Sequence, residues 1–282
     1  MTYNISMKTK TVAISTLGPV SAPFINTLKR SGKTTFTLDD AVTTYGKEKS
    51  KTVLFLSDLV KRKVITRIKS GVYLILDVGF ENAQLNNWPI IASHLAGDKP
   101  YYLSYYAAMR FHGMTTHPLF DITLTMPERH RAKKVDLITY HFIYSKPRYF
   151  WGFQSLWVTK QNKANVSNIE RTLLDGLDRP DLCGGIKEVV RGIWVKQNEI
   201  DWKKLAKYAR KFHTAAAVKR LGFILEMLEL GVGIIPQLIK IVTSAKGYIL
   251  LDLNGSKEGK FLNRWYIRIN MNIEELKAGV WA

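Results

Sequence analysis

The segment KSKTVLFLSDLVKRKVITRIKSGVYLIL, residues 49–76, predicts a helix that runs directly into a β-hairpin. In its first half, apolar residues recur at helical spacing and predict one buried stripe: Val53, Leu56, Val60 and Val64. In its second half, two arms rich in β-branched and aromatic residues flank Lys69-Ser70-Gly71, where Gly71 suits a tight turn. The chain upstream decides what kind of module this helix and hairpin belong to.

Two more helices are expected upstream of this segment. Residues 15–32 predict the first helix, with Gly32 as its C-terminal stop. Thr37 can cap the second helix, whose first turn carries two aspartates at the positive end of the helix dipole, and Gly46 ends it. The order of helix, helix, turn, helix and hairpin predicts a winged helix-turn-helix domain over residues 1–80.

Positive charge is concentrated in this first part. Residues 1–76 hold 13 lysines and arginines against four aspartates and glutamates, which is +9 of the total net charge of +19. Such a surface favours nucleic acid as a partner. In a helix-turn-helix the last helix enters the major groove with its N-terminal residues at the base edges, and the helix dipole also favours phosphate. The expected contacts to double-stranded DNA, from this helix and the hairpin, are Lys47, Lys49, Ser50, Lys51, Thr52, Lys61, Arg62, Arg67 and Lys69.

One position departs from the common pattern of such a domain. Where the last helix turns into the hairpin, the backbone tends to be left-handed, and glycine is often found there. Lys63 stands at that position. A left-handed lysine costs about 1 kcal/mol, which the fold can tolerate.

The remaining chain, residues 81–282, predicts a larger mixed α/β domain in which helices dominate the second half. Residues 119–128 and 135–145 alternate apolar and polar residues, as strands do. Residues 247–270 predict a hairpin with a long basic loop. The whole chain is therefore expected to be an α+β protein of two domains.

Several residues of this second part suit the ends of helices. Ser104 can cap a helix that ends near Gly113, and Ser167 with Glu170 three residues later forms a capping-box pattern. His112 lies at the end of the first of these helices, where a positively charged ring would suit the dipole.

The composition and the cysteine count indicate in which cellular compartment the protein is expected. With 46% hydrophobic and 23% charged residues, the chain can bury a core. The single cysteine, Cys183, cannot form an internal disulfide framework, and no cysteine and histidine spacing suggests zinc. The start lacks the apolar core of a signal peptide, and no apolar run reaches the roughly 18 residues that a membrane span needs. A cytoplasmic protein without membrane contact is expected.

No catalytic residue, cofactor or metal ion is expected. Three aspartates spaced by three residues could share a divalent cation on one helix: Asp175, Asp178 and Asp181. Pro180 interrupts this set, so capping and turn roles are the better interpretation. A metal-dependent nuclease would need two or three acids with a lysine around the metal. Asp121, Glu128 and Lys133 lack the strand-bound core of such a site.

A second basic cluster follows residue 127. Its members are Arg129, Arg131, Lys133, Lys134 and, further on, Arg148, which stands next to Tyr149, Phe150 and Trp151. Cations among aromatic rings can bind single-stranded nucleic acid by stacking, or can form a protein-binding hot spot. A solvated loop beside buried aromatic residues explains the same pattern.

Five blocks of the chain resemble the AbiE-type antitoxin family, the regulators of phage abortive-infection toxin–antitoxin pairs of type IV. They are RIKSGVYLI at 67–75, YYLSYYAAMRFHGMT at 101–115, VSNIERTLLDGLDRPDLCGGIKEVV at 166–190, RLGFILE at 220–226 and NRWYIRIN at 263–270. The resemblance implies an N-terminal DNA-binding domain that represses its own operon. It also implies a second domain, residues 81–282, that counteracts a nucleotidyltransferase-like toxin, and it favours the second basic cluster as a partner surface.

The leading hypothesis is therefore a repressor of its own promoter that is also an antitoxin. One alternative is a winged-helix transcription factor whose second domain senses a ligand or dimerises. A metal-dependent nuclease is the alternative from a different class. A neighbouring gene for a nucleotidyltransferase-like protein would separate the first two.

Overall fold

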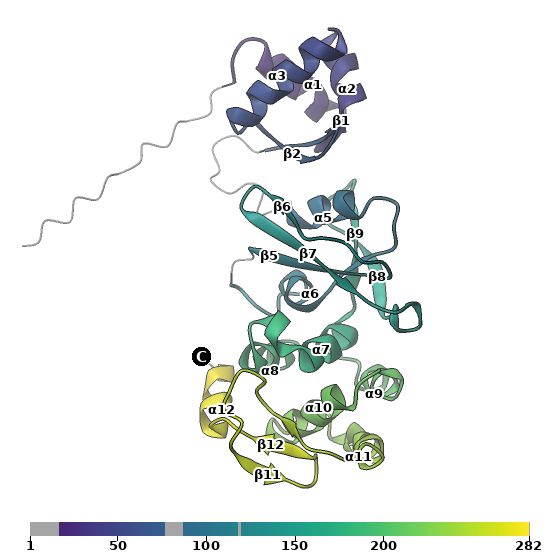
Figure 1. The fold of residues 1–282 in the computed structure, drawn as a ribbon, viewed down its shortest axis with the longest axis vertical. Helices are drawn as coiled ribbons and strands as arrows, with labels where there is room; N and C mark the ends of the chain where they lie inside the picture. Colours follow the sequence, from purple (N-terminus) through teal and green to yellow (C-terminus); the bar gives the residue numbers. More distant parts are fainter. Residues whose placement is uncertain (1–16, 77–86, 118–119, 282) are drawn as a thin grey trace, which may run out of the picture. The chain divides into compact units, whose positions relative to one another are not determined.

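The structure is a computed structural model of the chain, and it describes residues 17–76, 87–117 and 120–281. It divides into two compact units, Met1–Asn87 and Trp88–Ala282 (Figure 1). The expected domain boundary, between residues 80 and 81, lies outside the described residues. Both units combine helices with β-sheets, so the expected α+β class is confirmed.

The first unit combines three helices with a small antiparallel sheet. The sheet has the strand order β1-β3-β2, and phenylalanine and tyrosine rings from the helices and strands pack together over it. The elements are α1 (Ser21–Arg30), β1 (Thr35–Thr37), α2 (Leu38–Tyr45), α3 (Lys49–Lys61), β2 (Ile65–Lys69) and β3 (Val72–Ile75).

The local signals at the ends of α1 and α2 are confirmed. Thr37 caps α2 by accepting a hydrogen bond from the Asp40 backbone N–H, and the Asp40 carboxylate accepts one from the Thr37 N–H. Gly46 ends α2 in the left-handed conformation, and Gly32 takes the same conformation just after α1. These positions follow from backbone chemistry alone.

The buried stripe of α3 differs from the expected one. Val53 is 42% exposed, whereas Thr52, Leu56 and Leu59 face the core. A polar side chain can occupy this stripe because the Thr52 hydroxyl donates to the backbone carbonyls of the preceding turn, at 3.0–3.2 Å. The helix is therefore rotated about its axis relative to the prediction, by about the angle between neighbouring residues.

The junction between α3 and β2 is a Schellman motif. The Lys63 N–H donates to the Val60 carbonyl and the Val64 N–H to the Leu59 carbonyl, both at 3.0 Å. Lys63 has a φ angle of 54°, so the expected left-handed lysine is confirmed. Leu59 and Val64 are both fully buried in the core of this unit, as the motif favours.

The second unit begins with a six-stranded mixed sheet of order β6-β7-β5-β4-β9-β8. The strands predicted at 119–128 and 135–145 are confirmed as β5 and β7, which pair in parallel. The elements are α5 (Trp88–Ala96), β4 (Tyr102–Leu103), α6 (Tyr105–Phe111), β5 (Asp121–Met126), β6 (Lys133–Val135), β7 (Ile138–Tyr144), the 3-10 helix η1 (Pro147–Tyr149), β8 (Phe153–Trp157) and β9 (Lys163–Ser167).

The two faces of this sheet carry different helices (Figure 1). On one face, the Tyr140 hydroxyl reaches the Trp88 carbonyl of α5 at 3.5 Å. On the other, the Thr123 hydroxyl donates to the carbonyl of Ser104, the residue before α6, at 2.6 Å. Neighbouring residues of a strand point to opposite faces, so both faces of β5 are buried although two of its six residues are threonines.

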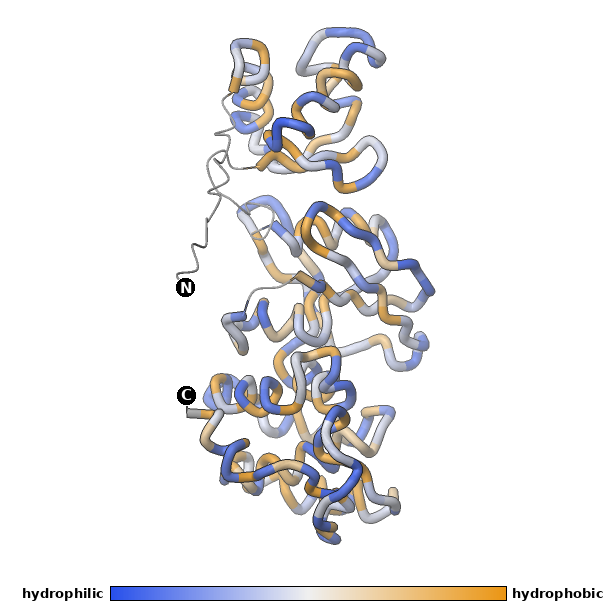
Figure 2. The backbone as a smooth tube through the Cα atoms, turned by 60° about the vertical axis from the view of Figure 1, so that its left-hand side comes forward, coloured by the Kyte–Doolittle hydropathy of each residue, from blue (hydrophilic) through white to orange (hydrophobic). Residues whose placement is uncertain are grey.

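The rest of the unit is mainly helical, and Figure 2 shows hydrophobic residues alternating with hydrophilic ones along its helices. This alternation suits amphipathic helices around a shared core. The elements are α7 (Ile169–Asp178), η2 (Pro180–Cys183), α8 (Ile186–Val195), α9 (Trp202–Lys211), α10 (Ala215–Met227), η3 (Val232–Ile234), α11 (Ile235–Thr243), β10 (Ile249–Leu250), β11 (Lys260–Leu262), β12 (Ile267–Ile269) and α12 (Ile273–Trp281).

Two expectations for this unit are wrong. The N-cap of α7 is Asn168, whose side chain accepts from the Arg171 N–H, because Ser167 is still the last residue of β9. The segment 247–270 is not one hairpin, since β10 pairs in parallel with β12 and only β11 pairs antiparallel with it. A strand therefore lies on each side of β12. The alternation of apolar and polar residues predicts strands but not which strands pair.

Among the described residues, we find no helix with the length and hydropathy that crossing a membrane would require.

Candidate functional site

Three polar residues open α3 and face the solvent. Lys49, Ser50 and Lys51 are all exposed, and the first turn of the helix contains no acidic residue. The Lys51 ammonium lies 3.3 Å from the carboxylate of Glu48, but both side chains are more than 60% exposed. An exposed pair of this kind contributes about 0–1 kcal/mol, so a stronger anion can displace it.

The remaining expected DNA contacts lie on the same unit. Lys47 is exposed in the turn before α3, and Lys61 is exposed near its end. Arg62 is half-buried and pairs with Asp58 at 3.2 Å. In the hairpin, Arg67 is exposed on β2 and Lys69 is half-buried beside the turn.

One of the predicted DNA contacts is wrong. Thr52 is fully buried and its hydroxyl is bonded within the helix, so it cannot reach a ligand. The same rotation of α3 exposes an apolar residue that the sequence did not single out, since Leu54 is 71% exposed. Its position four residues after Ser50 was a usable signal, because residues at that spacing share a helix face.

The second basic cluster lies along one side of the six-stranded sheet. Arg129, Arg131, Lys133 and Lys134 are exposed, and the two lysines stand on the edge strand β6. The Arg129 guanidinium lies 5.2 Å from the ring centre of Tyr144, the last residue of β7. Register therefore brings the arginines close to the carboxyl ends of β5 and β7.

The aromatic residues next to Arg148 pack against other side chains of the fold, whereas the lysines and arginines of the cluster are exposed. Arg148 is exposed, and its guanidinium lies 4.7 Å from the ring centre of Tyr149. Trp151 packs edge-to-face on Tyr208, and the guanidinium of Arg171 lies over its ring at 4.6 Å. The indole is thus occupied within the fold, and the half-buried Tyr149 ring likewise packs against His213, with 4.9 Å between the ring centres.

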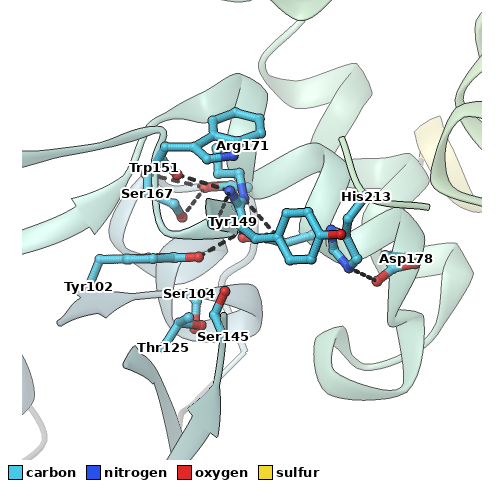
Figure 3. A network of polar contacts seen from close by, with 12 residues as sticks. Tyr102, Ser104, Thr125, Ser145, Tyr149, Trp151, Ser167, Arg171, Asp178 and His213 are labelled. Atoms are coloured by element: carbon cyan, nitrogen blue, oxygen red, sulfur yellow. Dashed lines mark hydrogen bonds and ion pairs between the residues drawn. The ribbon is translucent and has the colours of Figure 1, made fainter. Parts of the chain in front are cut away.

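A buried polar network joins the sheet to the helices (Figure 3). At its centre is Arg171, whose side chain is 3% exposed. Its guanidinium donates to the Asp175 carboxylate at 2.8 Å and to the Tyr102 hydroxyl at 3.0 Å. It also donates to the carbonyls of Tyr149 and Trp151, at 3.0 and 2.9 Å. Arg171 therefore braces β4, η1 and the following loop against α7.

Burial governs the ionisation of this network. It raises the pKa of the Asp175 carboxyl, and the guanidinium beside it opposes that rise. Burial also raises the pKa of the Tyr102 phenol, which keeps the hydroxyl protonated. One oxygen of Asp175 and the indole N–H of Trp151 have no hydrogen-bond partner. Because Arg171 bonds to β4, η1, the loop after it and its own helix, the network acts as a structural brace.

The acidic residues of α7 and of η2 after it are held apart by separate partners. Glu170 accepts from the Asp201 N–H at 3.0 Å and pairs with Lys204 at 2.8 Å, so the expected cap role is wrong. The Thr214 hydroxyl donates to Asp178 at 2.5 Å, and Asp181 pairs with Arg179 at 2.7 Å. Within 17–76, 87–117 and 120–281, no group of three such ligands could hold a metal ion.

Burial disfavours a positive charge on His112, although the end of a helix would suit one. Its Nε2 lies 2.6 Å from the Ser167 carbonyl oxygen, and burial lowers the pKa of its ring. The cost of desolvating a charged imidazole here exceeds what the hydrogen bond to that carbonyl returns. A neutral ring that donates to the carbonyl satisfies both groups.

These observations define an α+β protein with an exposed basic helix in its first unit and a braced sheet-and-helix second unit. A scan of protein-family models and a search of curated proteins find no match. A solved structure described as the RV2827C protein from Mycobacterium tuberculosis is similar, with 11% sequence identity and a TM-score of 0.67. The match covers 95% of this chain and 96% of that one. At this identity the likeness shows a shared fold alone.

Proposed function

We propose that the protein is a transcriptional repressor that binds its own promoter through an N-terminal winged helix. We propose also that it is an antitoxin, whose second unit counteracts a nucleotidyltransferase-like toxin. The first role is supported by the geometry of α3 and the hairpin. The second is supported by the sequence resemblance and by the way its blocks meet in the fold.

The exposed cations at the N-terminus of α3 are the observation that carries DNA binding. Lys49 and Lys51 stand where free backbone N–H groups and the helix dipole already attract anions. The element order α1, β1, α2, α3, β2, β3 supports a winged helix in which α3 lies in the major groove. Lys47 and Lys61 then flank the groove and contact its phosphates.

The β2–β3 hairpin suits the role of the wing. Arg67 and Lys69 stand on β2, and Gly71 turns the chain with a φ angle of 70°. A cationic hairpin beside the recognition helix can contact a flanking phosphate or the minor groove. Such contacts fix the position of the protein on the duplex without specifying its sequence.

The blocks that carry the resemblance meet in pairs within the second unit. Tyr102 of the block at 101–115 is bonded to Arg171 of the block at 166–190. Glu226 at the end of RLGFILE accepts from the indole N–H of Trp265 in NRWYIRIN, at 2.6 Å. These residues therefore maintain the fold, and a toxin would be bound by exposed residues elsewhere. We assign that role to the second basic cluster, Arg129, Arg131, Lys133, Lys134 and Arg148.

A mobility-shift titration with DNA from the protein's own upstream region tests the first role. Lys49→Gln with Lys51→Gln should reduce the slope of log affinity against log salt by about one unit per lost phosphate contact. Lys257→Gln with Lys260→Gln removes the same charge from exposed sites of the second unit and should leave the slope unchanged. Equal slopes for both double variants would contradict the assignment of α3.

Co-expression tests the second role. The full chain should restore growth to cells that express the nucleotidyltransferase-like protein encoded beside it. Charge reversal at Arg129 and Arg131 should weaken this rescue, whereas Lys49→Gln with Lys51→Gln should leave it intact. Failure of the unaltered chain to restore growth would remove the antitoxin role and leave the repressor role standing.

A further inference from the structure

The outward face of α3 is defined by which residues it buries. Thr52, Leu56 and Leu59 face the core at spacings of four and three residues. A helix with 3.6 residues per turn then directs the opposite positions away from the protein. These are Ser50, Leu54, Ser57 and Lys61, and all four are exposed.

Leu54 stands at the centre of this face. It is 71% exposed, and its neighbour Val53 is 42% exposed. Single exposed apolar residues are common on protein surfaces and need no explanation by themselves. Leu54 differs because the other exposed residues of its face are Ser50, Ser57 and Lys61, and Lys51 lies one turn before it, so a partner that covers it must also accept positive charge.

Duplex DNA is the partner that satisfies both requirements. Its phosphates match the lysines at the two ends of α3, and the floor of its major groove presents one apolar group, the C5-methyl of thymine. An acidic side chain near this face, Asp58, is paired with Arg62 at 3.2 Å, which offsets its repulsion of phosphate.

We propose that Leu54, supported by Val53, packs against thymine methyl groups in the major groove and selects thymine at that position of the operator. This inference rests on the DNA-binding role proposed above. The hydroxyls of Ser50 and Ser57 lie one helical turn to either side, and hydroxyls can donate to or accept from any base edge. Leu54 is therefore the residue of this face that discriminates between bases.

A double-mutant cycle between protein and DNA tests the contact. Binding of the full chain to its upstream fragment is measured by fluorescence anisotropy, with natural DNA and with DNA in which deoxyuridine replaces thymidine. Deoxyuridine lacks only the methyl group, and burying one such group corresponds to about fourfold in affinity. Each methyl that Leu54 covers should therefore weaken binding about fourfold when it is removed.

Leu54→Ala should bind natural DNA more weakly by a similar factor and should show no further loss on deoxyuridine DNA. Alanine favours helix at least as strongly as leucine, so the variant keeps its fold. Leu253→Ala, an exposed leucine of the second unit, should lose as much on deoxyuridine DNA as the unaltered chain does. The salt dependence of Leu54→Ala should equal that of the unaltered chain, since no charge is removed.

Three outcomes would overturn the inference. If Leu54→Ala loses as much on deoxyuridine DNA as the unaltered chain, the leucine does not contact the methyl groups. If Leu54→Ala leaves DNA affinity unchanged but alters the oligomeric state seen by light scattering, the face binds a second copy of the chain. If the unaltered chain shows no salt-dependent binding to its upstream fragment, the DNA-binding role itself fails and this inference fails with it.

Discussion

Lys51 and Arg171 occupy the same local position, the third residue of a helix, and they are used in opposite ways. The N-cap residues are Glu48 for α3 and Asn168 for α7. Lys51 is 69% exposed and has a single weak partner, whereas Arg171 is 3% exposed and makes four hydrogen bonds. A cation at a helix N-terminus opposes the dipole by about 0.3–1 kcal/mol in either place.

The difference shows what each cation is for. The hydrogen bonds of Arg171 to other elements offset its unfavourable interaction with the helix dipole. Its position therefore stabilises the second unit. Nothing comparable surrounds Lys49 and Lys51, and their placement lowers stability where a phosphate group would restore it. Exposed cations that the fold does not need are the ones available to a partner.

The largest expected effect is the loss of the buried brace. Arg171→Ala leaves the Asp175 carboxylate, the Tyr102 hydroxyl and two carbonyls without their donor. Breaking a buried ion pair costs about 3–5 kcal/mol, and we expect a loss of this size in the free energy of unfolding measured with urea. Arg179→Ala, which removes an exposed arginine paired with Asp181, should cost about 1 kcal/mol or less. Equal losses for the two variants would erase the distinction drawn between buried and exposed cations.

A smaller gain is expected where α3 meets the hairpin. Lys63→Gly relieves a left-handed side chain and should raise the free energy of unfolding of the first unit by about 1 kcal/mol. Gly32→Ala makes the reverse change at the equivalent position after α1, where φ is 75°, and should lower it by a similar amount. A destabilised Lys63→Gly variant would mean that the lysine side chain contributes more to the fold than its backbone conformation costs.

The free energy of unfolding of the first unit should rise by about 0.3–1 kcal/mol when an acid replaces a cation at the N-terminus of α3, where the helix dipole disfavours positive charge. Lys49→Glu places an acid at the N-terminus of α3, so the first unit should become more stable while binding to the upstream DNA is lost. Lys61→Glu makes the same charge change at the other end of the helix and should destabilise it. Thermal unfolding and the mobility-shift assay together measure the two changes. If both variants change stability in the same direction, the helix dipole does not determine the effect of charge at these two positions.

The smallest effect is expected from one buried imidazole. Because the pKa of His112 is lowered below its ordinary value of 6.5, the unfolded chain binds this proton more readily than the folded one. The stabilising contribution is therefore complete above about pH 6.5 and is lost as the pH falls through the folded pKa. His112→Gln keeps a donor for the Ser167 carbonyl and should flatten the fall in stability below about pH 6.5. Urea unfolding at each pH measures that fall. An unchanged slope would assign that fall to other groups.

Local signals in the sequence were sufficient wherever backbone chemistry decided the outcome. Thr37 as a cap, Gly46 as a stop and left-handed Lys63 all depend on residues within one or two turns. The strands β5 and β7 were predictable because both alternate polar and apolar residues. These predictions needed no knowledge of what the element would pack against.

Predictions about side-chain environment failed where packing decided the outcome. Thr52 was expected on the surface and Val53 in the core, because apolar periodicity does not reveal that a buried hydroxyl can bond within its own helix. Glu170 was expected as a cap, but its carboxylate is held by Asp201 and Lys204 from α9. Partners 31 and more residues away leave no trace in local spacing.

By itself, the sequence determined the α+β class, the concentration of positive charge in the first 76 residues and the residues that end α1 and begin and end α2, because each depends on composition or on neighbouring residues. The tertiary structure alone decided the rotation of α3 that exposes Leu54 and the burial of Arg171 at the junction of sheet and helices. Both depend on which surfaces meet, since the free energy of a charge or an apolar side chain is set by what surrounds it.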